Sequence, residues 1–390
     1  MRLERFEKIF NDSTSKYNKI KKEDYNSIGE FPIIDQGQNF IGGFTDDKSM
    51  ITNWGQPVIV FGDHTKVFKY VDFPFAIGAD GVKVLTLKDP LFNTKYYYFF
   101  LRSLKLTDAG YSRHYKFLKE SKLPLPLNLS DQLHIANLLS KAENLITLRK
   151  QSIALLDEFL KSTFLEMFGD FKVMSTSKLE FLGDNISYLT SGSRGWAQYY
   201  TESGAKFLRI QNIGGGIIRM DNLIHVNPPD SAEAERTRVK EGDLLISITA
   251  DLGRTSVIPK DFGEAYINQH LALIRLNKNI NPIYAAYFYN MPFGNNSIQK
   301  KNRAAVKAGL NFNDIKSFPI YIPSMVHQTQ FAEIVEKTEV LKTYYQSSLQ
   351  ELENLYGSLS QRAFRGELTL NKAEKQVLMA AEPEPQYNKL

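Results

Sequence analysis

The chain has 390 residues, more than one hydrophobic core usually holds, and 43% of them are hydrophobic, so we expect two or three folded domains. Its net charge of +5 is modest, the absence of cysteine excludes disulfides and thiolate metal sites, and the six histidines lack the HxH or HExxH spacing of a zinc site. The N-terminus has no apolar secretory signal and no apolar run reaches the ~20 residues that span a bilayer, which predicts a cytoplasmic protein without membrane contact.

Residues 1–121 form the first predicted domain, a basic block with 18 Lys and Arg against 15 Asp and Glu. PVIVFG (57–62) and VKVLTL (82–87) are apolar runs of strand length within it. Its polar loops offer hydrogen-bonding groups of the kind that read base edges, and its basic run at 113–119 suits phosphate contacts. The candidate DNA contacts here are Gln36, Gln38, Asn39, His64, Lys66, Arg113, Lys116 and Lys119.

Residues 122–170 form a predicted long helix that follows an extended, proline-containing segment. Ser130 and Asp131 are good N-cap residues, and apolar residues then recur at every seventh position for about five heptads. A helix from 130 to 168 would be roughly 58 Å long at 1.5 Å per residue, too long for an ordinary globular core. The residues predicted to form its packing seam are Leu139, Ile146, Ile153 and Leu160.

Residues 171–317 form the second predicted domain, also basic, with 18 Lys and Arg against 13 Asp and Glu. GDLLISIT (242–249) and HLALIRL (270–276) are its clearest strands. For any one loop residue the simpler interpretation is a solvated turn, so the clustering of such residues in both blocks carries the argument. The candidate DNA contacts are Ser191, Ser193, Arg194, Trp196, Arg209, Gln211, Asn212, Thr249, Arg254, Thr255, Asn268, Gln269, His270, Lys300, Lys301, Arg303 and Lys307.

Residues 318–368 form a second predicted long helix with the same seven-residue period. Ile334, Leu341 and Leu355 are expected beside its main stripe, and Gly366 is a plausible residue for ending the helix. Residues 369–390, which include EPEPQ, are predicted to be a disordered tail. The predicted packing residues are Phe331, Tyr345, Leu352 and Leu359.

The two long helices start with similar sequences. LPLPLNLSDQLHIANLL begins at Leu123, and FPIYIPSMVHQTQFAEIV begins at Phe318, with Gln132 matching Gln328 and Glu143 matching Glu339. Residues 76–101 and 266–291 also resemble each other, as a strand, a polar turn and an aromatic helix. We therefore predict a duplicated half, with the two long helices packed as a coiled coil. The alternative is two unrelated core helices.

Motifs for chemistry on DNA are missing. Asn-Pro-Pro-Asp at 227–230 resembles the element with which amino-methyltransferases stack a flipped base, but Asp230 stands where that element has an aromatic ring. There is no phosphate-binding GxxxxGK[ST] loop, and no PD…(D/E)xK nuclease pattern. The sequence therefore predicts no catalytic residue and no bound metal.

The two helix starts, the helix ends FLKSTFLEMFGD and SLSQRAFRGEL, and the loops IIDQGQNFIGGFTDD (33–47) and LTSGSRG (189–195) resemble those of specificity (S) subunits of Type I restriction–modification systems. The resemblance implies an α+β protein with two α/β target recognition domains separated by two long helices in an antiparallel coiled coil, related by a pseudo-twofold. Each domain would read one half of a bipartite double-stranded DNA target, while the coiled coil would set the spacer and dock the modification subunits.

The resemblance also implies a subunit that is not itself an enzyme and binds no cofactor. Its partners would be two modification (methyltransferase) subunits with S-adenosylmethionine and two ATP-dependent restriction subunits, which use Mg²⁺. The first domain starts abruptly, so its N-terminal strand is expected to be short or differently built. Two alternatives remain open: the specificity module of a related restriction enzyme of different architecture, and a coiled-coil protein-interaction scaffold with β-rich heads.

Overall fold

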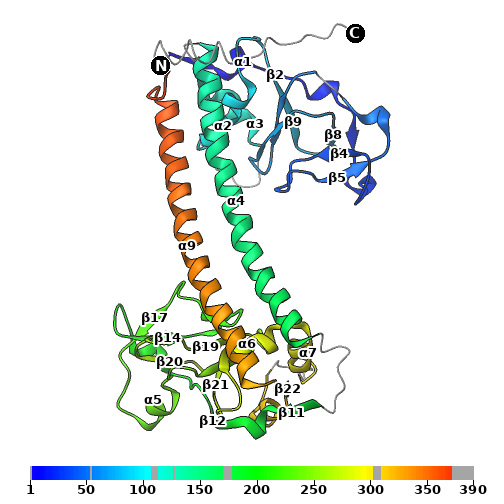
Figure 1. Cartoon of the computed structure of the whole chain (residues 1–390). Coiled ribbons are helices and arrows are strands. Elements are labelled where there is room, and N and C mark those ends of the chain that lie inside the picture. The colour runs from blue at the N-terminus through cyan, green and yellow to red at the C-terminus, as the bar shows by residue number, and fades with distance from the viewer. Residues whose placement is uncertain are drawn as a thin grey trace. The chain divides into compact units, whose positions relative to one another are not determined.

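The chain forms two compact units, each containing one α/β head and half of each long helix. The computed structural model describes residues 2–52, 55–106, 113–125, 128–169, 178–301 and 309–370. The first unit comprises Met1–Lys150 and Ser347–Leu390, and the second comprises Gln151–Gln346. The long helices are α4 (Leu129–Phe168) and α9 (Met325–Phe364), and both are 40 residues long (Figure 1).

The first head is built from two four-stranded sheets that share a core. Alternate residues of β6 point to opposite faces, as the period of a strand requires. Ile59 and Phe61 pack with the aromatic helix α2, whereas Val58 and Val60 pack in the cluster that contains residues of the other sheet. The sheet orders are β2-β9-β6-β7 and β3-β8-β4-β5.

The bounds of the first head's elements are β1 (Arg2–Arg5), α1 (Phe6–Ile9), β2 (Phe10–Asp12), β3 (Lys19–Ile20), β4 (Phe31–Ile34), β5 (Gly43–Thr45), β6 (Val58–Gly62), β7 (Phe68–Val71), β8 (Ala76–Gly78), β9 (Val82–Leu87), α2 (Thr94–Ser103), α3 (Tyr115–Glu120) and β10 (Lys122–Leu125).

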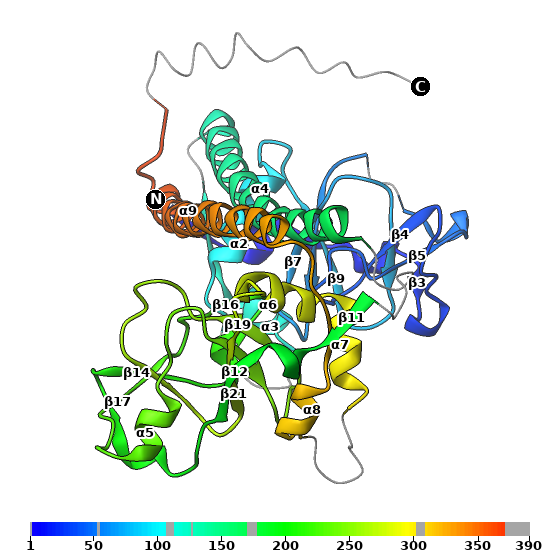
Figure 2. The ribbon, with the colours of Figure 1, turned by 60° about the horizontal axis from the view of Figure 1, so that its bottom comes forward.

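The second head repeats this plan, with sheets in the orders β12-β21-β18-β19 and β13-β17-β14-β20. Leu244 and Ile246 of β18 pack with the aromatic helix α6, and Leu245 between them packs with residues of the other sheet. Figure 2 shows α5 beside β14 and β17, where Ala234 packs in one cluster with Phe207.

The bounds of the second head's elements are β11 (Leu179–Phe181), β12 (Ile186–Ser191), β13 (Tyr200–Thr201), β14 (Ala205–Leu208), β15 (Ile213–Gly214), β16 (Ile217–Ile218), β17 (Ile224–Val226), α5 (Ala232–Thr237), β18 (Leu244–Ser247), β19 (Thr255–Val257), β20 (Ala265–Ile267), β21 (Leu271–Leu276), α6 (Pro282–Asn290), α7 (Pro292–Gln299), α8 (Phe312–Lys316) and β22 (Pro319–Tyr321).

The internal duplication is confirmed by equivalent strand pairs. A parallel pair occurs in each head, β4 with β8 and β14 with β20. The first strand of each head pairs antiparallel with the strand before the long helix, as β1 with β10 and β11 with β22. The first strand is short, as expected, but it is not differently built, because β1 pairs over four residues and β11 pairs in the same way over three.

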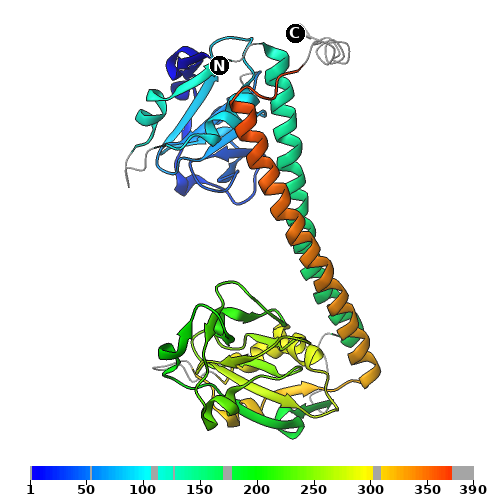
Figure 3. The same ribbon diagram turned by 90° about the vertical axis from the view of Figure 1, so that its left-hand side faces the viewer.

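The two long helices pack on one another in both units, which excludes the alternative of two unrelated core helices. In the first unit, Leu139 near the start of α4 shares a core with Ala363 near the end of α9. In the second unit, the ring of Phe164 near the end of α4 lies 5.2 Å from that of Phe331 near the start of α9. The helices are therefore antiparallel, as Figure 3 shows.

The residues predicted to form the packing seam are buried or half-buried in the structure. Leu139, Leu160 and Phe331 are buried. The rest of the predicted seam is half-buried, namely Ile146, Ile153, Tyr345, Leu352 and Leu359.

Two details of the helix predictions are wrong. Leu341 and Leu355 are exposed, and Val335 is buried instead. The side chain that caps α4 belongs to Asn128, whose Oδ1 accepts from the backbone N–H of Asp131 at 2.8 Å, because the helix starts one residue earlier than expected. Gly366 does follow the end of α9 with φ of 82°, as predicted.

Candidate nucleic-acid interface

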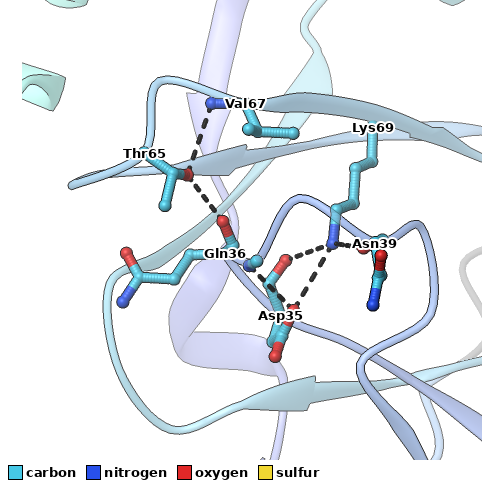
Figure 4. Close-up of polar contacts among 7 residues, drawn as sticks. Asp35, Gln36, Asn39, Thr65, Val67 and Lys69 are labelled. Atoms are coloured by element: carbon cyan, nitrogen blue, oxygen red, sulfur yellow. Dashed lines mark hydrogen bonds and ion pairs between the residues drawn. The ribbon is translucent and has the colours of Figure 1, made fainter. Parts of the chain in front are cut away.

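In the first head, three loops meet beside the carboxyl end of β4, and Figure 4 shows two of them, with Gln36 and Thr65 labelled. The β6–β7 hairpin is joined to the loop after β4, because Thr65 Oγ1 donates to the backbone oxygen of Gln36 at 2.6 Å. It is joined to the β8–β9 turn, because the N–H of Asp63 donates to the oxygen of Gly81 at 2.7 Å. Three segments distant in sequence are thus joined, and two of them, the loop after β4 and the β6–β7 hairpin, carry Gln36, Gln38, Asn39, His64 and Lys66.

Gln36 differs from the other predicted residues of its loop. Its Oε1 accepts from the backbone N–H of His64 at 3.3 Å, and its side chain fills the space that a Cβ on Gly81 would occupy. Gln36 therefore braces the hairpin against the turn. Gln38 and Asn39, by contrast, are exposed and available to a ligand.

The basic run of the first head lies next to the same hairpin. The N–H of Tyr115, at the start of α3, donates to the Asp63 carboxylate at 2.7 Å. Arg113, Lys116 and Lys119 are exposed on this segment, whereas His64 and Lys66 of the hairpin are half-buried. The hairpin is therefore bonded to one segment that exposes positive side chains and to another that exposes amides, the two kinds of group that phosphate and base contacts require.

In the second head, six predicted residues from three segments line one cleft of about 410 Å³. The aromatic side chains of Tyr200 and Phe207 also line this cleft, as does Gly195. The six are Trp196, Arg209, Gln211, Asn268, Gln269 and His270.

His270 connects this cleft to the β18–β19 hairpin. Its Nδ1 is hydrogen-bonded to Thr249 Oγ1, and its Nε2 lies 3.0 Å from Gln269 Nε2. Its backbone N–H donates to the Asn268 side chain at 3.1 Å. The structure therefore brings together Thr249 and residues 268–270, which the sequence could only name separately.

Four predicted residues have buried side chains with internal partners. Trp196 stacks on Phe207 with ring centroids 5.1 Å apart. The buried amide of Asn212 donates to the backbone oxygens at Arg219 and Asp221, each at 3.1 Å. The other two are Thr255, whose Oγ1 donates to the Ala286 oxygen at 2.8 Å, and Asn268. In this structure the polar side chains of Asn212, Thr255 and Asn268 bond other parts of the second head, and the prediction that all four residues touch DNA stays a prediction.

Arg236, which the sequence did not single out, holds the loop that follows β12. Its guanidinium donates to Thr190 Oγ1, to the Ser191 oxygen at 2.7 Å and to Ser193 Oγ at 2.9 Å. Arg194 in the same loop is exposed. No local pattern could have identified Arg236, because its role depends on where α5 packs.

Among the remaining basic candidates, Arg254, Lys300 and Lys301 lie on the β18–β19 hairpin or next to it. Arg254 is paired with Asp251 at 2.5 Å, and Gln299 at the end of α7 donates to the Leu252 oxygen at 2.9 Å. Lys300 and Lys301 follow directly, and Lys300 is exposed. Arg303 and Lys307 lie outside the described residues.

Among the residues that the structure describes, no group of His, Cys, Asp and Glu is placed to hold a metal ion. The helices of this described part include none that is long and apolar enough to cross a membrane.

A doubled α/β head with polar loops at equivalent positions defines a duplicated recognition module. Residues 7–158 and 207–354 both match the family of Type I restriction modification DNA specificity domains, and the chain belongs to this family. The family resemblance inferred from the sequence and the α+β fold class are thereby confirmed.

Relatives and one solved structure agree with this assignment. The chain is 26% identical over 192 residues to the Type I restriction enzyme EcoBI specificity subunit of Escherichia coli, covering 46% of this chain and 39% of that subunit. It is 23% identical over 352 residues to the EcoR124I/EcoR124II specificity subunit of Escherichia coli, covering 83% and 82%. The S subunit of a Type I restriction–modification system from M. genitalium shares the fold, with a TM-score of 0.62, 18% identity and coverage of 93% and 96%.

Proposed function

We propose that this chain is the DNA sequence-specificity subunit of a Type I restriction–modification complex, in which each head reads one half of a bipartite DNA target. One observation carries the proposal: the same fold occurs twice, but its equivalent loops differ in chemistry. The loop after β4 exposes Gln38 and Asn39, whereas the loop after β14 carries Arg209 and Gln211. A repeated scaffold with different loops suits two different half-sites.

The chain itself performs no catalysis in this proposal. Methyl transfer belongs to two modification subunits that bind S-adenosylmethionine, and cleavage to two restriction subunits that use ATP and Mg²⁺. The family membership of the chain supports this division of labour.

The exposed apolar residues of the long helices support docking of the modification subunits. In the second unit, Leu155 and Phe159 of α4 are 62% and 50% exposed, and Val340 and Tyr344 of α9 are 58% and 69% exposed. These residues lie beside the seam rather than in it. Apolar side chains at helical spacing outside a seam are typical of a surface that a partner helix covers.

The long helices also act as a ruler in this proposal, since they connect the two heads and fix the spacer between the half-sites. At 1.5 Å per residue, 40 residues extend about 60 Å. A seven-residue seam keeps two such helices in register along their length.

The test is to map methylated adenines across the genome of a strain that expresses this chain with its partner subunits. We expect one bipartite motif that is absent without the chain. A methylation pattern that does not depend on the chain, or a motif that is not split, would contradict the proposal.

A further inference from the structure

The exposed loop after β4 is fastened by a lysine buried within the first head. Lys69 lies in β7, and its side chain is only 3% exposed. Its Nζ donates to the backbone oxygens of Asp35 at 2.7 Å and Asn39 at 2.5 Å, and it lies 3.4 Å from Asp35 Oδ1 (Figure 4). One ammonium group thus joins the two ends of the turn 35–39.

A buried lysine at this position destabilises the folded head unless its ammonium group is hydrogen-bonded or paired with an opposite charge. Burial disfavours an ammonium group, and it lowers the pKa of Lys69, while the nearby Asp35 carboxylate opposes this effect. An apolar residue would fit the strand at no such cost. The hydrogen-bond partners of Nζ, Asp35 and Asn39, both belong to the loop, so Lys69 stabilises the conformation of the loop rather than the sheet.

We propose that residues 38–41 form the base-reading tip of the loop after β4 in the first head and that Lys69 is its positioning residue. This inference rests on the function proposed above and names the residues that carry out half of it. Gln38, Asn39, Phe40 and Ile41 form the exposed tip of the loop.

The Asp35 carboxylate also stabilises the conformation of this loop. Its Oδ1 accepts from the backbone N–H of Gly37 at 2.8 Å. A Cβ on Gly42 would lie 2.5 Å from this carboxylate, so only glycine lets the returning chain pass. Lys69, Asp35 and the two glycines therefore hold the tip in one conformation before any ligand arrives, which lowers the entropy cost of binding.

The tip has the chemistry of A·T recognition. Amide side chains such as those of Gln38 and Asn39 can bond the N6 and N7 groups of adenine together, and apolar side chains contact the methyl group of thymine. Phe40 and Ile41 are exposed apolar residues next to these amides. The positions read by this loop are therefore expected to be A·T pairs.

In the second head, the equivalent loop is held by a side-chain amide instead of a lysine. The loop after β14 is held by the buried amide of Asn212, whose Oδ1 accepts from the N–H of Arg209 at 3.1 Å. A change at Lys69 should consequently alter the first half-site alone.

The experiment maps the methylated motif produced by the full complex with three versions of this chain. These are the wild type, Lys69→Met and the control Lys48→Met, which changes an exposed lysine. For Lys69→Met we expect discrimination at A·T positions of one half-site to fall about tenfold or more, with the other half-site and the spacer unchanged. Lys48→Met should give the wild-type motif. A second variant, Gln38→Ala with Asn39→Ala, leaves the fastening intact and should relax the same positions.

An unchanged motif in the Lys69→Met complex, or equal loss at both half-sites, would overturn the role of Lys69. If Lys69→Met fails to fold, the double alanine variant decides: the wild-type motif from that variant would overturn the reading role of the loop. A wild-type complex that yields no bipartite motif would instead contradict the proposed function itself.

Discussion

The side-chain oxygen of Gln132 accepts a hydrogen bond from the backbone N–H of Asn93 at 2.7 Å. Gln132 lies in the first turn of α4, and Asn93 caps α2 of the first head, so this bond joins a long helix to its head. The second unit repeats the bond between Gln328 and Asn281 at 2.8 Å. The glutamine that occurs in both helix starts is therefore a structural link.

Removing this link should destabilise the first unit. Gln132→Ala removes the side-chain partner of the partly buried N–H of Asn93 and of the oxygen of Leu91, which costs about 1 kcal/mol or more. Hydrogen exchange at the start of α2 should accelerate accordingly. The matched control is Gln151→Ala, at an exposed position of the same helix. It should change neither the stability of the first unit nor the exchange rate at the start of α2. Equal protection of Asn93 in the Gln132 variant would contradict the link.

Two neighbouring residues of α4 should separate helix packing from partner docking. Leu160 is 2% exposed and Phe159 is 50% exposed. Leu160→Ala should lower the free energy of unfolding by about 2–5 kcal/mol through a cavity, measured by urea denaturation. Phe159→Ala should change it by about 0.5 kcal/mol or less but weaken binding of the modification subunit. Unchanged affinity for that subunit would contradict docking at this face.

Lys116 and Lys119 should contribute sequence-independent affinity. If both contact phosphates, replacing each with alanine should reduce the slope of log affinity against log salt by about 1. The loss should be the same for target and non-target duplexes, as measured by titration of the complex with labelled DNA. The exposed Lys161→Ala on α4 is the control with the same charge change. A loss confined to the target duplex would assign these lysines to base reading instead.

High pH should destabilise the first head through the half-buried Tyr25. Burial, with the Asp35 and Asp80 carboxylates nearby, raises the pKa of Tyr25 to about 12. Because this value exceeds the ordinary pKa of about 10, the stabilisation is complete below pH ~10 and is lost as the pH rises toward ~12. Thermal melting should therefore fall over that range, and less steeply in Tyr25→Phe. The exposed Tyr344→Phe should follow the wild-type curve, and an identical decline in Tyr25→Phe would refute this cause.

Much of the architecture could be predicted from local patterns in the sequence. A seven-residue period sustained over a 40-residue helix located α4 to within one residue at its start. Apolar runs located strands β6, β9, β18 and β21, because a buried strand must be apolar along its length. The parallel pairing of Ile34 with Ile77 had no such signal, since it depends on residues distant in the chain.

For the candidate DNA-contact site, the sequence could predict which loops take part but not what each residue in them does. The sequence could not distinguish Gln36, which braces the hairpin, from the exposed Gln38, because burial decides between them. Lys69 in the strand FKYV has the pattern of a residue on a solvent-facing side, and only its burial reveals that it holds a loop. Positioning residues of this kind emerge from tertiary packing, which single-sequence patterns do not encode.

The central claim is that two heads read two half-sites at a spacing fixed by the long helices, and lengthening both helices tests it most directly. Seven residues inserted between Lys150 and Gln151 and seven between Gln346 and Ser347 preserve the seam. Mapping of methylated sites should then return the same two half-sites with a longer spacer. The same half-sites with an unchanged spacer would contradict the account.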